Sequence, residues 1–190
     1  MTSAGGVVWV FGYGSLIWRP AMVHVARRAG RLDGWVRRFW QASTDHRGTV
    51  EAAGRVLTLV EGEGAVWGMA YAIESAAWPD IEAALELREQ QGYARRTVEI
   101  GLAAGQQAGG IIETVAGLLY VATFANPYFV GPEPLEATAE VVRRSYGPSG
   151  SNIEYVLELE RALAAMGAAD AEVSALAERV RVPHAQASGG

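Results

Sequence analysis

The sequence predicts an α+β fold in which strands occupy the first two-thirds of the chain and helices the last third. Runs rich in β-branched and aromatic residues, separated by glycine-containing turns, recur as far as residue 123. From Leu135 onward, apolar residues recur at helical spacing instead. With 190 residues, half of them hydrophobic, the chain is long enough for one well-buried domain and short for two. We therefore expect a single domain over residues 1–182 and a disordered tail over 183–190.

Five or six strands are expected. Two of them form a predicted hairpin whose turn is 61–64, because acidic residues alternate with glycines there between two apolar runs. Gly30 and Gly34 are expected at bulges or turns of the second strand. The glycine-rich connector 104–110 is typical of a variable hairpin tip without a function. The expected strands cover residues 7–11, 28–41, 55–60, 65–73, 93–102 and 111–123.

A helix over 75–88 separates the strands and carries the most informative acidic residue of the chain. Trp78, Ile81 and Leu85 recur at i, i+3 and i+7, and the next position of this apolar stripe is Glu89. A glutamate at a helix end is normally solvated. Here the register directs the carboxylate inward, where desolvation raises its pKa toward neutrality and suits it to act as a general base.

The remaining helices supply one candidate site residue. Ser151 and Glu154 fit a capping box, so Glu154 has a structural explanation and is not assigned to catalysis. Tyr155 lies on the inward face of the same helix. A buried tyrosine usually only satisfies its own hydroxyl, although a phenol beside a site can orient a substrate. Helices are expected over residues 135–146, 151–166 and 171–180.

Two loops contain the other candidate site residues. The first is Gly-Tyr-Gly-Ser-Leu at 12–16, which follows a buried strand; glycines on both sides of Tyr13 leave backbone N–H groups uncovered, so the loop can receive an anion. Taken alone, such a glycine pair after a strand is more often a simple turn than a binding loop. The second is Ser-Thr-Asp-His-Arg-Gly at 43–48, polar enough to hold a zwitterionic peptide. Its alternative interpretation is a hydrogen-bonded Asx-turn with a solvated Arg47.

Charge and composition exclude several classes of function. The net charge of −5 argues against a nucleic-acid-binding protein, which needs a basic face. An arginine cluster on the second strand is expected to be split between its two faces and solvated. That cluster comprises Arg27, Arg28, Arg31, Arg37 and Arg38.

Metal and membrane chemistry are not expected either. The chain has no cysteine, which excludes a disulfide and a thiolate nucleophile, and its three histidines are scattered. The N-terminus lacks the layout of a signal peptide, and the longest apolar stretch, 111–125, is short for a membrane span and contains Glu113. We expect a cytoplasmic protein without a cofactor or metal; the sequence does not fix its oligomeric state.

Five segments together resemble the ChaC family of γ-glutamylcyclotransferases, whose members cleave glutathione to 5-oxoproline and cysteinylglycine. The resemblance extends from about Trp9 to about Val180, and it implies that the strands close into a small mixed β-barrel flanked by helices. Two family positions differ: Ala53 stands where proline is common, and Glu172 where histidine is common. The segments are FGYGSLIWRP at 11–20, FWQASTDHRGT at 39–49, REQQGY at 88–93, NPY at 126–128 and GPSGSNIEY at 147–155.

The resemblance also implies a mechanism that needs no nucleophile from the protein. The α-amine of a γ-glutamyl peptide attacks its own γ-carbonyl, so the protein must fold the glutamyl chain, accept a proton and return one to the leaving nitrogen. Glu89 is the expected general base and acid, and the first loop is expected to hold the oxoproline half. His46, Arg47 and, less directly, Arg19 are expected at the cysteinylglycine end. The expected substrate-binding residues are Gly12, Tyr13, Gly14, Ser15, Leu16, Asp45, His46, Arg47 and Tyr155.

Two alternatives stay open on the sequence. One is a cyclotransferase for other γ-glutamyl amines or amino acids, although the second loop favours glutathione because simpler substrates offer it less to hold. The other is a non-catalytic binding or regulatory module on the same fold, which has no use for a buried base at Glu89. A purely structural protein explains neither the loop nor the acid.

Overall fold

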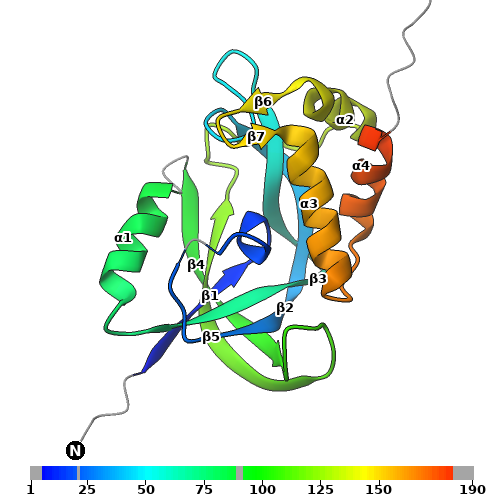
Figure 1. Ribbon diagram of the computed structural model, residues 1–190. Coiled ribbons are helices and arrows are strands. Elements are labelled where there is room, and N and C mark those ends of the chain that lie inside the picture. The colour runs from blue at the N-terminus through cyan, green and yellow to red at the C-terminus, as the bar shows by residue number, and fades with distance from the viewer. Residues whose placement is uncertain (1–5, 21, 89–91, 182–190) are drawn as a thin grey trace, which may run out of the picture.

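The computed structural model describes residues 6–20, 22–88 and 92–181, and its centre is a five-stranded β-barrel. The strands follow one another around the ring in the order β1-β3-β2-β4-β5, and β5 returns to β1 (Figure 1). Every pairing is antiparallel except the one between β1 and β5, so the predicted mixed barrel is confirmed. The strands are β1 (Val7–Gly12), β2 (Ala26–Ser43), β3 (Gly54–Glu74), β4 (Tyr93–Ala103) and β5 (Ile111–Ala122).

The predicted hairpin with a turn at 61–64 is wrong, because those residues continue a single strand of 21 residues, β3. Both halves of β3 pair with β2, and the pairing shifts register where Asp33 and Trp35 lie opposite Ala65 and Glu61. Gly34, at a φ of 78°, takes the conformation that this shift requires on the β2 side. A glycine-rich acidic stretch therefore produced a bulge here and not a turn. The bulge predicted at Gly34 is confirmed, whereas the one predicted at Gly30 is wrong, because Gly30 pairs regularly with Gly68 and Leu102.

The barrel interior is narrow and filled by large side chains. Fully buried members of the core include Phe11, Leu32, Ile100 and Leu119, from four different strands. A Cβ at position 68 would lie only 2.7 Å from the Phe11 ring, so a glycine there makes room for the aromatic ring. Because this core fills the barrel, a cavity can form only at an open end.

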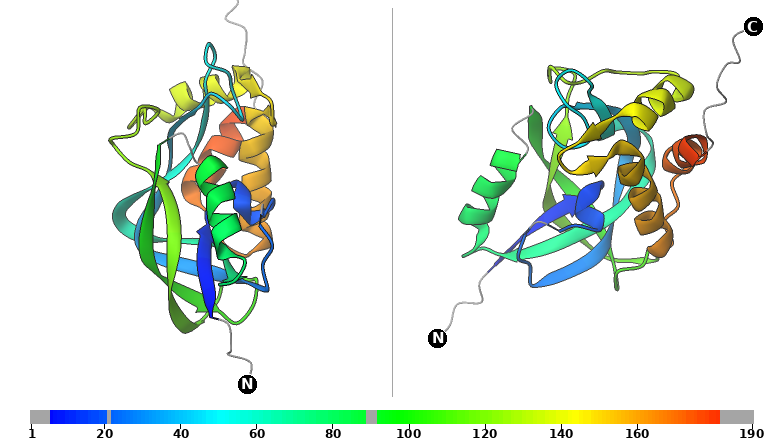
Figure 2. Two further views of the ribbon diagram at one scale, coloured as in Figure 1. Left: turned by 90° about the vertical axis from the view of Figure 1, so that its left-hand side faces the viewer. Right: turned by 45° about the horizontal axis from the view of Figure 1, so that its top comes forward.

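In the part of the chain that the structure describes, four helices cover the outside, in the segments where helices were predicted. Figures 1 and 2 show α1 on one side of the barrel and α2 to α4 together on the other. The Ser151 side chain accepts a hydrogen bond from the Glu154 N–H, which confirms the predicted cap of α3. Gly167, with a φ of 69°, ends that helix as expected. The elements are α1 (Trp78–Arg88), α2 (Leu135–Arg144), α3 (Asn152–Ala165), α4 (Ala171–Arg181) and the short strands β6 (Tyr146–Gly147) and β7 (Gly150–Ser151).

The connector 104–110 is fixed to the rest of the fold. The Ala108 N–H donates to the Met166 carbonyl over 2.8 Å, and the Gln107 side chain donates to the Ala165 carbonyl over 2.9 Å. The connector therefore ties the end of α3 to the barrel at the tip of the β4–β5 hairpin.

The prediction that the arginines of the second strand are solvated is wrong for Arg37. Only 2% of the residue is exposed, and its guanidinium donates to the carbonyls of Tyr13 and Trp67 and to the Asp170 carboxylate. Strand alternation does split the cluster between the two faces of β2. The face that carries Arg37 is covered by α4, however, and is not open to solvent. A buried charge that makes three such bonds is part of the architecture.

Two general properties concern the described residues only. Among residues 6–20, 22–88 and 92–181, no helix is both long and apolar enough to cross a bilayer. Within the same part of the chain, no group of three or more histidine, aspartate or glutamate side chains is arranged to hold a metal ion.

Candidate active site

A cavity of about 510 Å³ lies at one end of the barrel. Its walls come from the residues after β1, the end of β2, the start of β3, the start of β4 and the end of β5, with α3 on one side. A volume of this size is in the range of small-molecule sites. Eight of the nine predicted binding residues line it, namely Tyr13, Gly14, Ser15, Leu16, Asp45, His46, Arg47 and Tyr155; Gly12 instead ends β1 opposite Met69.

The first predicted loop forms one wall of the cavity and is held by bonds from buried side chains. Residues Ser15–Ile17 form a short 3-10 helix, in which the Ile17 N–H donates to the Gly14 carbonyl over 2.9 Å. The Tyr71 hydroxyl donates to the Leu16 carbonyl over 2.5 Å. Burial raises the pKa of Tyr71 to about 12, so this hydroxyl stays protonated and remains a donor at neutral pH.

The second predicted loop forms the facing wall, and its backbone packs closely on neighbouring backbone. The Ser43 hydroxyl accepts from the Arg47 N–H over 3.0 Å, and the Ser149 N–H donates to the His46 carbonyl over 2.9 Å. A Cβ at Gly48 would lie 2.5 Å from the Ser43 carbonyl oxygen, so only glycine fits there. The side chains are freer: Asp45 and His46 are exposed, and the His46 Nδ1 lies 3.2 Å from the Ser149 hydroxyl.

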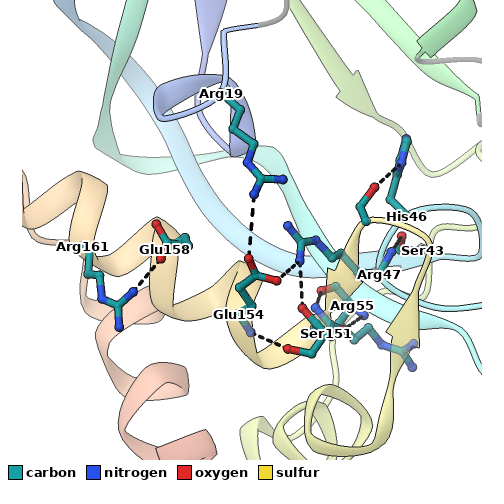
Figure 3. Close-up of polar contacts among 11 residues, drawn as sticks. Arg19, Ser43, His46, Arg47, Arg55, Ser151, Glu154, Glu158 and Arg161 are labelled. Atoms are coloured by element: carbon teal, nitrogen blue, oxygen red, sulfur yellow. Dashed lines mark hydrogen bonds and ion pairs between the residues drawn. The ribbon is translucent and has the colours of Figure 1, made fainter.

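Arg47 is neither solvated nor uncommitted. Its guanidinium, with a side chain only 5% exposed, donates to the Ser151 carbonyl over 3.0 Å and to the Glu154 carboxylate over 3.1 Å (Figure 3). Arg19 approaches the same carboxylate at 3.8 Å from the loop after η1 (Ser15–Ile17). The interpretation as an Asx-turn with a solvated Arg47 is therefore wrong in respect of the arginine, and Glu154, which the sequence explains as a cap, also pairs with two cations at the cavity edge.

Tyr155 faces inward, as its helical register predicts. Its hydroxyl lies 3.4 Å from the Leu57 N–H, a long hydrogen bond, and its ring lies 5.7 Å from that of Trp18. A Cβ at Gly14 would lie 3.1 Å from the same hydroxyl, so Tyr155 directly abuts the first loop. The Arg47 guanidinium lies 5.7 Å from the ring centre, which joins both loops at one side chain.

Glu89 lies outside the residues that the structure describes. Leu85 and Tyr93, four residues before and after it, both line the cavity. Sequence reasoning did not assign Tyr93 and Tyr120 to the site, although both line it. Tyr120 accepts the Tyr13 hydroxyl on its carbonyl over 2.9 Å. Two signals could have found them: Tyr93 ends the REQQGY segment of the family resemblance, and Tyr120 is an aromatic residue near the end of a predicted strand.

Comparison with known proteins shows to which family this chain belongs. A family model described as ChaC-like protein matches residues 8–183. The "Glutathione-specific gamma-glutamylcyclotransferase" of Saccharomyces cerevisiae is 34% identical, covering 87% of this chain and 89% of the yeast protein. The "Glutathione-specific gamma-glutamylcyclotransferase 1" of Homo sapiens is 41% identical, covering 80% of this chain and 68% of the human protein. The chain belongs to the ChaC-like family.

A solved structure supports the same conclusion. The crystal structure of the glutathione-specific γ-glutamyl cyclotransferase from yeast, labelled with selenomethionine, superposes with a TM-score of 0.85 at 32% identity, covering 93% of this chain and 96% of the yeast chain. Agreement over this length shows that the barrel and the flanking helices are shared features. The predicted fold class is confirmed by this match as well as by the strand pairing.

Proposed function

We propose that this protein is a γ-glutamylcyclotransferase that cleaves glutathione to 5-oxoproline and cysteinylglycine. One observation carries the proposal: the cavity brings together two loops, 13–16 and 43–48, that were predicted as substrate-binding from separate parts of the sequence. Relatives with this printed activity at 34% and 41% identity support it. We further propose that it acts as a single domain in the cytoplasm without nucleic acid.

The chemistry that we assign to the first loop is anion binding during ring closure. The substrate's α-amine attacks the γ-carbonyl, the C–N bond to cysteine breaks, and the leaving nitrogen takes a proton. Backbone N–H groups at the start of the 3-10 helix are suited to hold the α-carboxylate or the oxyanion. Phe11, Val56 and Leu57 make part of the cavity lining apolar.

Glu89 is the proposed base and acid. Leu85 and Tyr93 both line the cavity, so the chain enters and leaves the segment that contains Glu89 at the cavity wall. A carboxylate in a partly apolar pocket has the raised pKa that proton exchange with an ammonium group requires near neutral pH. The family resemblance assigns the acid to the same position.

The second loop is the proposed site of the cysteinylglycine half. His46 and Asp45 present exposed polar side chains to the cavity, and Arg47 carries a positive charge beneath them. The ion pair between Arg47 and Glu154 bears on the choice of substrate, because the cation that would bind a terminal carboxylate already has a partner. This observation favours, as the second candidate, a cyclotransferase for γ-glutamyl compounds without that carboxylate.

The deciding experiment incubates purified protein with reduced glutathione, without metal or nucleotide, and measures 5-oxoproline and cysteinylglycine. Release of both in equal amounts is the expected result. Release of 5-oxoproline only from γ-glutamyl amines or amino acids would support the second candidate. Absence of product from all these substrates would contradict cyclotransferase activity and leave a binding module.

A further inference from the structure

Arg37 is the most deeply buried charge that the described residues contain outside the cavity wall, and it reaches the first loop from beneath. It lies in the middle of β2, where it is 2% exposed. Its Nε donates to the Tyr13 carbonyl over 3.1 Å, Nη1 donates to the Asp170 carboxylate over 3.0 Å, and Nη2 donates to the Trp67 carbonyl. Arg37 itself does not line the cavity.

The bond to Tyr13 determines more than the position of one carbonyl. The Tyr13 carbonyl and the Gly14 N–H belong to the same planar trans peptide, so they point in opposite directions, and fixing one fixes the other. Gly14 lines the cavity, and its own carbonyl is occupied by the Ile17 N–H. Glycine at this position has no Cβ to limit rotation of the peptide plane. The orientation must therefore come from outside the loop.

Asp170 holds Arg37 in turn and belongs to a different element. Its Oδ2 pairs with Arg37, while its Oδ1 accepts from the N–H groups of Glu172 and Val173 over 3.1 Å and 3.2 Å. The carboxylate thus caps α4 and anchors the guanidinium at once. Burial lowers the pKa of Arg37 and the nearby Asp170 opposes that change, so the carboxylate keeps the guanidinium charged.

We propose that Arg37 is a positioning residue for catalysis: through the Tyr13 carbonyl it aims the Gly14 N–H at the substrate, and Asp170 at the start of α4 holds Arg37 in place. This inference rests on the proposed function, since it assigns Gly14 a role in binding the γ-glutamyl half. Lysine cannot replace arginine in it, because one ammonium lacks the three divergent donors that reach Tyr13, Trp67 and Asp170.

Arg28 provides a matched control on the same strand. Its guanidinium likewise donates to a backbone carbonyl, that of Ala103 over 2.6 Å, and to a carboxylate, that of Glu113 over 2.7 Å. None of these three residues lines the cavity. Arg37→Lys and Arg28→Lys therefore remove the same kinds of bond at different distances from the first loop.

The test compares these variants at a temperature where circular dichroism shows each to be folded. We expect Arg37→Lys to lower kcat/KM for glutathione on the order of 10- to 100-fold and Arg28→Lys by less than about twofold. In the free protein, the amide resonance of Gly14 in a ¹H–¹⁵N spectrum should move in Arg37→Lys and stay in place in Arg28→Lys. A purely structural role would lower Tm but leave both quantities unchanged in the folded variant, and that result would overturn the proposal.

Asp170→Asn keeps the proposal testable if Arg37→Lys does not fold. Asparagine retains an oxygen for capping α4 but loses the charge that holds Arg37. A lowered kcat/KM together with a shifted Gly14 resonance is expected, and wild-type values for both would again contradict the proposal. If the wild type itself does not cleave glutathione, the proposed function fails, whereas the Gly14 resonance in the free protein still decides whether Arg37 sets that peptide.

Discussion

The two loops that face each other across the cavity are held in different ways. Loop 13–16 is fixed by buried side chains that bond its backbone, with Arg37 on the Tyr13 carbonyl and Tyr71 on the Leu16 carbonyl. Loop 43–48 is packed closely through its own backbone, but Asp45 and His46 remain exposed. One wall presents bonded backbone and is called the rigid wall; the other presents exposed polar side chains and is called the adjustable wall.

We propose that this difference corresponds to a division within the substrate. Every γ-glutamyl compound has the same glutamyl half, which must bend to a fixed geometry for ring closure. The leaving amine differs from one γ-glutamyl compound to another. A rigid wall suits the constant half, and an adjustable wall suits the variable half.

Glu89→Gln should abolish turnover whichever loop binds which half, because it removes the proposed proton acceptor. We expect a loss of about 10²- to 10⁴-fold in kcat with binding of 5-oxoproline retained. Glu82→Gln is the control, since Glu82 lies seven residues earlier and pairs with Arg95. The measurement is 5-oxoproline release together with titration of the product; normal turnover by folded Glu89→Gln would remove Glu89 from the mechanism.

Gly14→Ala tests the rigid wall. The added Cβ would lie 3.1 Å from the Tyr155 hydroxyl, on a loop that cannot yield because its carbonyls are bonded from beneath. We expect kcat/KM to fall roughly tenfold or more for every γ-glutamyl substrate alike. Gly105→Ala is the control, because no described residue other than its two chain neighbours has a heavy atom within 4 Å of a Cβ there. A loss confined to glutathione would place the constant half elsewhere.

Glu154→Gln tests the adjustable wall. It removes the carboxylate that pairs with Arg47, while the backbone N–H of residue 154 still bonds the Ser151 cap. If Arg47 binds the terminal carboxylate of glutathione, KM for glutathione should fall roughly two- to fivefold, with no change for a γ-glutamyl amine. That pattern would separate the two walls directly.

Glu158→Gln is the matched control for that experiment. Glu158 lies one turn further along α3. Its carboxylate pairs with Arg161 at a distance of 2.5 Å, and neither residue lines the cavity (Figure 3). Its KM values should equal those of the wild type. An unchanged KM in Glu154→Gln as well would mean that the Arg47–Glu154 pair only supports the fold.

Glu172→Gln has the smallest expected effect. Glu172 lies beside Asp170, which holds Arg37 beneath loop 13–16. Burial, together with the neighbouring Asp170, raises the pKa of Glu172, whereas Arg38 opposes the shift. A raised carboxyl pKa means that Glu172 stabilises the fold best when protonated, and that this contribution is lost as pH rises through the folded pKa. Glutamine should therefore raise Tm at pH 7 by roughly 1 to 3 °C.

The pH dependence checks the cause of that gain. Below about pH 3 the carboxyl is protonated in both the folded and the unfolded state, and the difference in Tm between variant and wild type should vanish. A difference that persists at low pH would mean that packing and not ionisation separates the two side chains.

Much of the barrel could be predicted because its strands have clear boundaries, as at β4 and β5, where connector residues 104–110 separate two apolar runs. The hairpin predicted at 61–64 failed because a strand bulge and a tight turn share the same glycine-rich composition. Local sequence does not report that the opposite strand, β2, is long enough to pair with both halves of β3.

The site was predicted where it consists of contiguous loop residues. The partners of those loops were not: Tyr120 and Arg37 act through contacts over 107 and 24 residues of sequence, which no local pattern encodes. Arg37 was misjudged because five arginines on one strand look alike in sequence. The structure separates them by burial: Arg37 is 2% exposed, whereas the side chains of Arg28 and Arg38 are 18% and 33% exposed.

The parallel seam between β1 and β5 has a consequence for the order of folding. Trp9 and Val10 pair there with Gly117 and Leu118, more than a hundred residues further along the chain. Closing so long a loop costs entropy that only later contacts repay, so this seam belongs among the last parts of the chain to form. Loop 13–16 follows β1 directly. A chain still emerging from the ribosome, with β5 and α3 not yet made, therefore lacks the walls that Tyr120 and Tyr155 contribute to the cavity.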